Sequence, residues 1–343
     1  MLGSVPLVSI VIVGHNSLTD IQSCLLSVFS IDYPNYEVVY VDNSSDDGTV
    51  DYVKRSFENV IVIESRENLG YGKACNMGVK HSRGQFLNFL NPDTRVDRRW
   101  LSETMKEILK NGNIGVCGSK ILFLDGKRIQ SLGGTYNAET GYALDIGFGI
   151  ETSKVPLTSS IIPVFYCCGA SLLVRREVFI RIGGFDEDYF LYYDDVDLCW
   201  RIRMLGYEVC SSLHSLVYHR MMPERAHASS YRTFVEKNSL CTMIKNLEVR
   251  SIIRLFPFCA FIRLMIFLFF VLHGKNEYAL PILSGFWNSV LNFRRIYEKR
   301  KHVQQMRKLA DDLVLRPSLL LPFTTLLTMF FAEILPIVQR DKR

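Results

Sequence analysis

The feature that most constrains the fold of this chain is a regular alternation of short apolar runs and amphipathic segments over its first 120 residues. The short runs fit buried strands, and the segments between them carry apolar residues at helical spacing. Strands that alternate with helices imply right-handed crossovers and a mostly parallel sheet covered on both faces. We therefore predict an α/β fold with strands at residues 7–13, 36–41, 60–63 and 85–90 and helices at 19–29, 49–57, 72–80 and 99–110.

Polar residues stand where each of these predicted strands ends. Open α/β sheets bind ligands at the carboxyl ends of their strands, so these residues are expected to line one site. Helix capping explains residues 46–49, but it does not explain the coincidence at four strands. A glycine-rich turn with Gly70, leading to Asn76, is a weaker signal for a diphosphate at a helix N-terminus. The polar residues at the strand ends are His15, Asn16, Asp42, Arg66, Asn68, Asn91 and Asp93.

An acidic segment at residues 183–201, GGFDEDYFLYYDDVDLCWR, is the second strong signal. Clustered carboxylates repel one another unless a cation or a proton lies between them. If a helix begins near Asp194, the side chain of Asp195 lies close to its apolar stripe and faces inward, whereas Asp197 points away and can pair with Arg201. An inward carboxylate that the helix dipole keeps ionised suits a general base.

Two further residues suggest a metal site. An acid after a strand is most often a turn residue, and a lone histidine at the end of an apolar strand is usually structural. Asp93 and His219 occur in such positions on separate strands, and together they suit Mg²⁺ or Mn²⁺. A site of oxygen ligands with one imidazole favours Mn²⁺.

The middle of the chain and its cysteines carry less information. Residues 124–163 are rich in Gly, Ser and Thr and are expected to form loops or a small hairpin, and a strand is expected at residues 170–175. Nine cysteines without a CxxC pair indicate buried thiols in a reducing compartment. The apolar N-terminus lacks a basic region and continues into a strand, so we predict no signal peptide and a cytosolic catalytic part.

The C-terminal part differs in composition. Residues 246–343 carry 15 Lys and Arg against 7 Asp and Glu, whereas the whole chain has 40 against 35. Two apolar segments, 255–272 and 318–338, approach spanning length but contain prolines and charges, and basic residues crowd 293–308 between them. We predict helices that lie in the membrane interface, with full spans or a soluble helical subdomain as alternatives. Apolar runs between the basic residues argue against nucleic acid.

Several motifs together resemble one family. VSIVIVGHN, VVYVDNSSDDGT, RENLGYGKACNMGVK, FLNPDTRV, the acidic segment and YHR occur in the order and spacing of family-2 glycosyltransferases with the GT-A fold. The resemblance is to the rhamnosyltransferase-like branch, which builds lipid-linked glycans and cell-surface polysaccharides. It implies a glycosyltransferase domain at residues 1–245, and composition adds a membrane-associated helical tail at 246–343.

The resemblance also implies roles for single residues. Asp195 matches the catalytic base, Asp42 a contact to the nucleotide base, and Asp93 the last acid of the metal-binding element. His219 matches a metal or diphosphate contact, and Gly169 and Asp194 lie on the acceptor side. The chain departs from the family where Asn91 begins the metal element and where Asp194 replaces a glutamate. The remaining residues expected to bind the nucleotide sugar are His15, Asn16, Arg66, Asn68, Gly70, Asn76 and Asn91.

These observations predict an inverting, metal-dependent enzyme that transfers a sugar from a nucleoside diphosphate to a hydroxyl of a lipid-linked glycan at the cytoplasmic face of the membrane. A polyprenyl-phosphate sugar synthase and a catalytically silent nucleotide-sugar-binding scaffold are the alternatives. A nucleotidyltransferase is disfavoured because no basic triphosphate loop follows the first strand.

Overall fold

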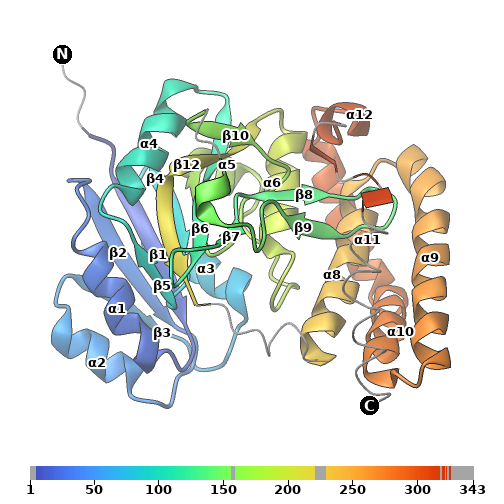
Figure 1. Cartoon of the computed structure of the whole chain (residues 1–343), viewed down its shortest axis with the longest axis horizontal. Helices are drawn as coiled ribbons and strands as arrows, with labels where there is room; N and C mark the ends of the chain where they lie inside the picture. Colours follow the sequence, from blue (N-terminus) through green and yellow to red (C-terminus); the bar gives the residue numbers. More distant parts are fainter. Residues whose placement is uncertain are drawn as a thin grey trace. The chain divides into compact units, whose positions relative to one another are not determined.

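The computed structural model describes residues 5–155, 159–220 and 229–316, together with 319, 320, 322, 324 and 325. The chain forms two compact units, one of Met1–Gly134 and Asp145–Met221 and the other of Thr135–Leu144 and Met222–Arg343. We call them the sheet unit and the helical unit (Figure 1). The sequence placed the division after residue 245. The structure places it earlier, because the helix at 229–246 packs with the helices that follow it.

The sheet unit is built on one sheet with the strand order β10-β12-β6-β11-β4-β1-β2-β3. Strands β4, β1, β2 and β3 run parallel, β11 runs antiparallel between β4 and β6, and β12 is parallel to β6. The α/β fold predicted from the alternation is confirmed. The strands are β1 (Val8–Gly14), β2 (Tyr36–Asp42), β3 (Val60–Glu64), β4 (Phe86–Leu90), β5 (Thr94–Val96), β6 (Ile114–Phe123), β7 (Ile129–Ser131), β10 (Ile161–Pro163), β11 (Ser171–Arg175) and β12 (Glu208–His219).

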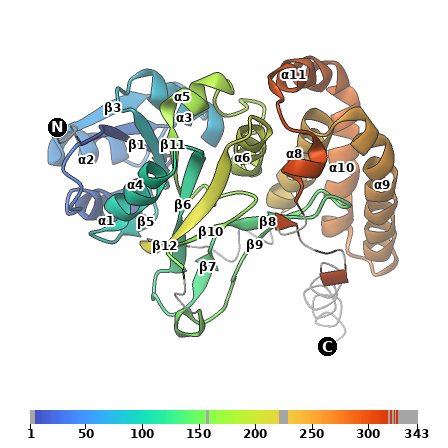
Figure 2. The same cartoon turned by 90° about the horizontal axis from the view of Figure 1, so that it is seen from above.

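Helices cover both faces of this sheet (Figure 2). Ile10 and Ile12 of β1 point into a core with α1, α2 and α4, whereas Val11 points to α3 on the opposite face, where Gly78 allows close approach. Each of the four predicted helices is present within one or two residues of its predicted bounds. The helices are α1 (Leu18–Val28), α2 (Thr49–Ser56), α3 (Tyr71–Lys80), α4 (Trp100–Lys110), α5 (Arg176–Arg181) and α6 (Asp194–Met204).

The segment at 124–163 holds short strands and the 3-10 helix η1 (Thr152–Lys154). Its hairpin, β8 (Gly134–Tyr136) and β9 (Ala143–Asp145), is the small hairpin expected there. The tip of this hairpin belongs to the helical unit, which sequence patterning did not indicate.

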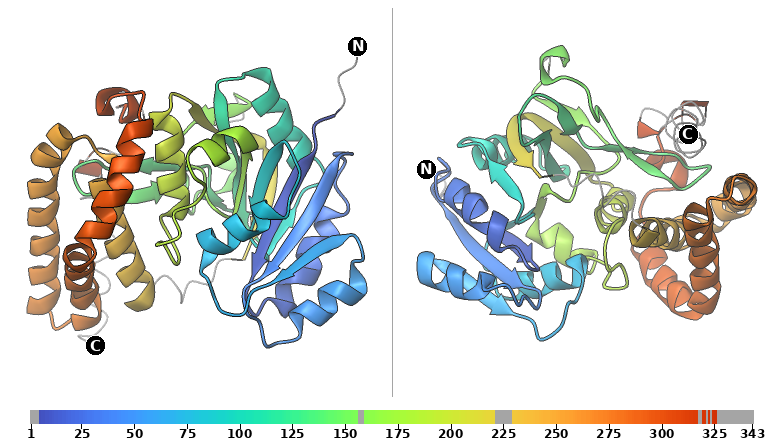
Figure 3. Two further views of the ribbon diagram at one scale, coloured as in Figure 1. Left: turned by 180° about the vertical axis from the view of Figure 1, so that it is seen from behind. Right: turned by 60° about the horizontal axis from the view of Figure 1, so that its bottom comes forward.

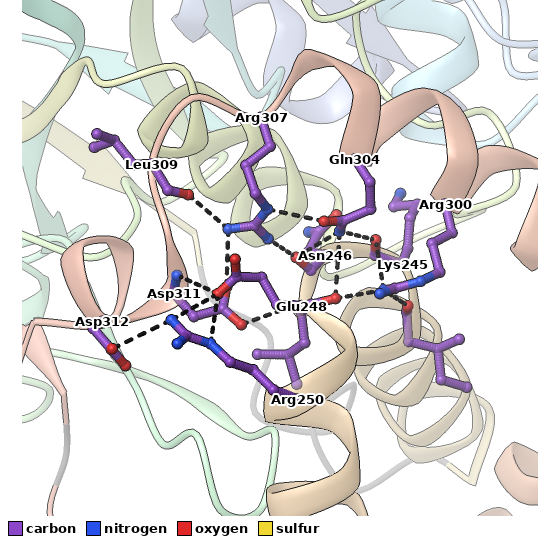
Figure 4. Close-up of polar contacts among 12 residues, drawn as sticks. Lys245, Asn246, Glu248, Arg250, Arg300, Gln304, Arg307, Leu309, Asp311 and Asp312 are labelled. Carbon is purple, nitrogen blue, oxygen red and sulfur yellow. Dashed lines mark hydrogen bonds and ion pairs between the residues drawn. The ribbon is translucent and has the colours of Figure 1, made fainter.

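The helical unit contains α8 (Ser229–Asn246), α9 (Val249–Leu272), α10 (Asn276–Leu291), α11 (Phe293–Met306) and α12 (Asp311–Val314). Figure 4 shows how its helices are joined: Arg300, Gln304 and Arg307 donate to carbonyl groups at the end of α8. Of the helices that the structure describes, α9 alone is long and apolar enough to cross a membrane. The second predicted apolar segment, 318–338, lies almost wholly outside the described residues.

Candidate active site

The candidate site lies at the edge of the sheet where β1, β2, β3 and β4 end. Strand β11 runs the opposite way beside β4, with Ser171 opposite Leu90, so the residues that precede it reach the same edge. Gly169 is one of them. The N-terminus of α6 and the end of β12 complete the site with Asp195 and His219. The topology therefore brings the separate sequence signals together.

The loops after β1 and β2 are tied to each other. Asn16 receives a hydrogen bond from the backbone N–H of Asp46 (2.9 Å) and donates its own N–H to Ser45 Oγ (2.9 Å). His15 is exposed, with Nδ1 3.0 Å from the carbonyl oxygen of Asn43. These contacts give the two loops one fixed shape and leave the imidazole ring accessible to a ligand.

Asp42 ends β2 and is 3% exposed. Its Oδ2 accepts a hydrogen bond from the N–H of Ser45 (2.9 Å), whereas its Oδ1 has no hydrogen-bond partner among the described residues. A buried carboxylate oxygen without a donor is costly unless a ligand or water supplies one. Asp42 therefore suits recognition of a donor group such as a base N–H or a ribose hydroxyl.

The loop after β3 is shaped by Asn43, which sequence analysis did not rank as a site residue. Its side chain donates to Asn68 Oδ1 (2.9 Å) and accepts from the N–H of Leu69 (2.8 Å). Gly70 has φ +75°, and a Cβ there would collide with the backbone of Phe190 in the acidic segment. The loop thus requires glycine at this position, and the side chain of Arg66 remains exposed at its start.

The side chain of Asn76 bonds to the backbone of the acidic segment. Its side-chain amide donates to the carbonyl of Phe185 (2.9 Å) and accepts from the N–H of Phe185 (3.0 Å). Both backbone groups are thereby fixed, so Asn76 positions the acidic segment against α3. Its contact with a nucleotide sugar stays a prediction.

Asp93 and His219 meet at the centre of the site. Oδ1 of Asp93 lies 3.1 Å from Nε2 of His219, and Nδ1 of His219 lies 3.0 Å from Oε1 of Gln130. Because an amide oxygen accepts, the ring proton belongs on Nδ1, and the Nε2 lone pair then faces the carboxylate. Two acceptors at this distance need a proton or a cation between them. Nδ2 of Asn91, 3.4 Å from Nε2, approaches the same nitrogen.

This geometry fits a divalent cation. Two neighbouring ligands of an octahedral ion with bonds of about 2.1 Å lie about 3 Å apart, close to the observed separation. Gln130 would orient the imidazole, as the partners of metal-bound histidines commonly do. Within the described residues no group of three or more His, Cys, Asp and Glu could hold a metal, so the remaining ligands would come from substrate or water.

Asp195 is the only residue of α6 that is not buried. The helix is enclosed on all sides, not amphipathic as the sequence suggested: Asp197, expected to point away, is buried, although its predicted pairing with Arg201 is present at 2.8 Å. Oδ2 of Asp195 accepts from the N–H of Gly169 (2.8 Å) and Oδ1 from the N–H of Val196 (2.8 Å). Burial, with a smaller contribution from the charge of Asp145, raises the pKa of Asp195 to about 6.

That pKa suits a base that works near neutral pH. It also differs from the low pKa expected of a carboxylate that the helix dipole keeps ionised, because desolvation outweighs both backbone hydrogen bonds. Asp194 is buried, and burial together with the charge of Asp195 raises the pKa of Asp194 well above its ordinary value. Burial leaves the expected acceptor contact of Asp194 without support.

Backbone strain is concentrated in these loops. Tyr192 and Tyr193, directly before α6, both have φ +67°, a conformation that is unfavourable for aromatic residues. Asn16 and Ser44 are the other non-glycine residues with positive φ in the described part of the chain. All four lie in loops of the candidate site, a distribution typical of functional sites.

Asp145, at the end of β9, is a carboxylate that sequence analysis missed. Its Oδ1 accepts hydrogen bonds from Ser131 Oγ (2.7 Å) and Tyr166 Oη (3.3 Å). Burial raises the pKa of Asp145 to about 6, and the charge of Asp145 acts on Asp195. Because residues 124–163 have no periodic pattern, no sequence signal marked this position.

The parallel sheet, the loops at its edge and the carboxylates they hold define the class of the protein as a glycosyltransferase with the GT-A fold. The chain belongs to glycosyl transferase family 2, whose family model matches residues 9–183.

Three named relatives are 23% to 29% identical to this chain over the aligned residues. The low-salt glycan biosynthesis hexosyltransferase Agl10 of Haloferax volcanii is 23% identical over 66% of the chain and 72% of its own length. Rhamnosyltransferase WbbL of Escherichia coli is 26% identical over 58% of the chain and 78% of its length. The N-acetylglucosaminyl-diphospho-decaprenol L-rhamnosyltransferase of Mycobacterium tuberculosis is 29% identical over 50% of the chain and 62% of its length.

The predicted resemblance to rhamnosyltransferases is confirmed by these relatives. The chain covers only a quarter (25%) of another relative, the uncharacterized protein y4gI of Sinorhizobium fredii, at 29% identity. Among solved structures, a mannosyltransferase of Pyrobaculum calidifontis in complex with GDP-Man and Mn²⁺ aligns with a TM-score of 0.54 and 16% identity over 88% of this chain and 86% of its own. GalNAc-T7 with UDP, GalNAc and Mn²⁺ aligns with a TM-score of 0.62 and 15% identity over 92% and 57%. At such identities these structures support the fold alone.

Proposed function

We propose that this protein is an inverting glycosyltransferase that moves a sugar, of hexosyl or rhamnosyl type, from a nucleoside diphosphate to a hydroxyl of an acceptor glycan. The single observation that carries the proposal is Asp195: one partly open carboxylate on a fully enclosed helix, fixed by two N–H donors, with a pKa of about 6. Such a group can remove the acceptor proton while the acceptor oxygen attacks the anomeric carbon from the face opposite the diphosphate.

The donor is bound by the loops at the sheet edge. The unpaired Oδ1 of Asp42 accepts from the nucleotide, and the loops that contain His15, Asn16 and residues 66–70 enclose the nucleoside and diphosphate. Asp93 and His219 hold a divalent cation, for which the complexes of the two structural neighbours with Mn²⁺ give indirect support. When bound, this cation neutralises charge on the departing diphosphate.

The acceptor that we propose is a lipid-linked glycan at the cytoplasmic face of the membrane. Two observations support it: the mycobacterial relative is named for a decaprenol-linked acceptor, and the helical unit is both basic and apolar. The function would then lie in the synthesis of a cell-surface polysaccharide or glycoconjugate.

Asp195→Asn tests the mechanism. We expect turnover to fall about 10³-fold while nucleotide affinity, measured by calorimetry, stays unchanged, because the amide keeps the shape but cannot accept the proton. Glu177→Gln, at an exposed acid of α5, is the matched control and should keep its activity. Normal turnover of Asp195→Asn would overturn the assignment of the base and would favour a phosphate acceptor, which needs none.

Mass spectrometry of products identifies the substrates. Nucleotide sugars are incubated with Mn²⁺ and membrane lipid extract, and the expected product is one lipid-linked sugar. Its anomeric configuration, determined by NMR, should be inverted relative to the donor. Free sugar as the sole product with every extract, or retained configuration, would contradict the proposed reaction.

A further inference from the structure

Helix α9 reverses the usual arrangement of a helix in a water-soluble protein. Its buried stripe contains Ser251, Leu255, Cys259 and Arg263, at intervals of four residues, followed by Phe270. The opposite face is exposed and apolar. From Pro257 to Leu272 no exposed residue of α9 carries a charge.

Arg263 is enclosed by polar partners and is 0% exposed. Its guanidinium donates to Glu236 (2.9 Å) and Ser239 (2.7 Å) on α8, and to the carbonyl of Thr140. It also lies 4.6 Å from the ring centroid of Tyr142, whose hydroxyl donates to Glu236. The one charge in the apolar stretch of α9, which argued against a full membrane span in the sequence, is therefore turned into the helical unit and neutralised there.

The exposed apolar surface continues onto α10, which runs antiparallel to α9 after a short turn (Figure 3). Small residues on the inner side of α10 allow close packing; Gly285 lies against the backbone of Glu236 on α8. We call the joint outer surface of the two helices the α9–α10 face. Its exposed side chains are Phe258, Phe261, Leu264, Met265, Leu268, Val271 and Leu272 of α9 and Leu280, Leu283, Trp287, Val290 and Leu291 of α10.

So many exposed apolar side chains on two neighbouring helices are unfavourable in permanent contact with water. We propose that the α9–α10 face is embedded in one leaflet of the membrane, as a monotopic anchor. Charges turned inward and apolar side chains turned outward are the arrangement that lipid requires. Exposed basic residues at one end of the face, Arg254, Arg294 and Arg295, complement anionic headgroups.

The dimensions favour embedding over spanning. The uncharged exposed stretch of α9 runs from Pro257 to Leu272, bounded by Arg254 and His273, and at 1.5 Å per residue it is about 24 Å long. The hydrocarbon core of a bilayer is about 30 Å thick. The 16 residues of α10 are fewer than a span requires. The face thus fits a position parallel to the membrane surface.

Tryptophan fluorescence tests this position. Of the three tryptophans, Trp100 and Trp200 are fully buried in the sheet unit, whereas Trp287 is 67% exposed on the α9–α10 face. The full-length protein is mixed with vesicles of phosphatidylcholine and phosphatidylglycerol whose acyl chains carry bromine either near the headgroup or near the bilayer centre. We expect bromine to quench Trp287, more strongly from the shallow position, and Trp287→Phe to abolish this quenching.

Two variants test whether the α9–α10 face is the part of the protein that binds the vesicles. Phe261→Glu combined with Leu268→Glu should lower vesicle partitioning at least tenfold, because both side chains already point outward and the fold does not need them. Ile180→Glu, at an exposed apolar residue of the sheet unit, is the matched control and should partition like the wild type.

The inference rests on the membrane location proposed above but not on the reaction, and vesicle binding is measured without donor or acceptor. Loss of transfer with normal quenching would therefore count against the reaction alone. Absence of quenching would overturn the inference, whether a second copy or residues 318–338 cover the face. Stronger quenching from the bilayer centre would overturn the one-leaflet position in favour of a span.

Discussion

The two compact units of this chain differ in the side chains that they expose, although both enclose apolar residues such as Ile10 and Phe270. In the sheet unit, Ile10, Ile12 and Trp100 are fully enclosed, and the polar residues gather at one edge of the sheet. In the helical unit, Ser239 and Arg263 are enclosed, whereas Phe261 and Trp287 are exposed. Since a folded chain turns away from its surroundings the groups that they disfavour, the contrast fits the membrane position that we propose for the α9–α10 face.

Both units nevertheless bury an ion pair, and this shared feature allows the comparison to be tested. Asp197–Arg201 lies inside the sheet unit, and Glu236–Arg263 lies inside the helical unit. In each pair the arginine donates to backbone carbonyls as well as to the acid. The carbonyls carry no net charge, so the acid alone balances the positive charge of the arginine.

The largest effect is expected when one partner of a buried pair is removed. Asp197→Asn and Glu236→Gln each leave a buried guanidinium without its counter-ion and should cost about 3–5 kcal/mol of folding free energy. Hydrogen exchange should place each loss in its own unit. Asp51→Asn, at an exposed pair with Arg55, should change stability by less than about 1 kcal/mol.

A small loss for Glu236→Gln alone would mean that water reaches Arg263. The helical unit would then not conceal its charge, and the contrast between the two units would fail.

A smaller effect is expected at the loop that joins β3 to α3. Gly70→Ala should destabilise the sheet unit by about 2–3 kcal/mol, because the new Cβ meets the backbone of Phe190 and φ is +75°. Gly48→Ala has a similar φ of +85° but open space around the new Cβ, so it should cost only about 1 kcal/mol. Chemical denaturation measures both. Equal losses would show that the loop after β3 is not held against the acidic segment.

The sheet could be predicted from sequence because local patterns decide it. The buried strands and the amphipathic helices of the first 110 residues leave a periodic trace, and their bounds were recovered within one or two residues. Strand β6 was missed because Gly115, Gly118 and Lys120 interrupt its apolar pattern. The glycine at position 118 is explained by tertiary packing, because it leaves room for the side chain of Cys167 from a distant segment.

The candidate site could be predicted in part for the same reason. Asp42 and Asp93 follow strands, and the strand order of a parallel sheet brings such residues together. Asp145 and Gln130 come from the irregular segment between residues 124 and 163, where only the folded structure shows what they face. The burial of α6 on all sides could not be predicted either. Charged residues such as Asp197 and Arg201 normally mark an exposed helix face, and only the structure shows that they pair in the interior.

The smallest expected effect concerns a buried carboxylate of the sheet unit that is held by two hydroxyl groups. Glu236 in the helical unit is neutralised by Arg263, whereas Asp145 is held by the hydroxyls of Ser131 and Tyr166, and its negative charge helps to raise the pKa of Asp195 to about 6. A base works when ionised, so kcat/KM should rise with pH through about 6 in the wild type.

Asp145→Asn removes that negative charge and should move this acidic limb to lower pH by up to about one unit.

The same substitution should also change how the stability of the fold depends on pH. Asp145 and Asp195 both have raised pKa values, so these two groups bind more protons in the folded chain than in the unfolded chain. Their contribution to stability therefore falls as the pH rises from about 4 through 6. Asp145→Asn should make this fall shallower, whereas Glu58→Gln, at an exposed acid of the same unit, should leave both profiles unchanged. If Asp145→Asn leaves the acidic limb of the kcat/KM profile unchanged, the charge of Asp145 does not affect Asp195. Burial alone would then raise the pKa of Asp195.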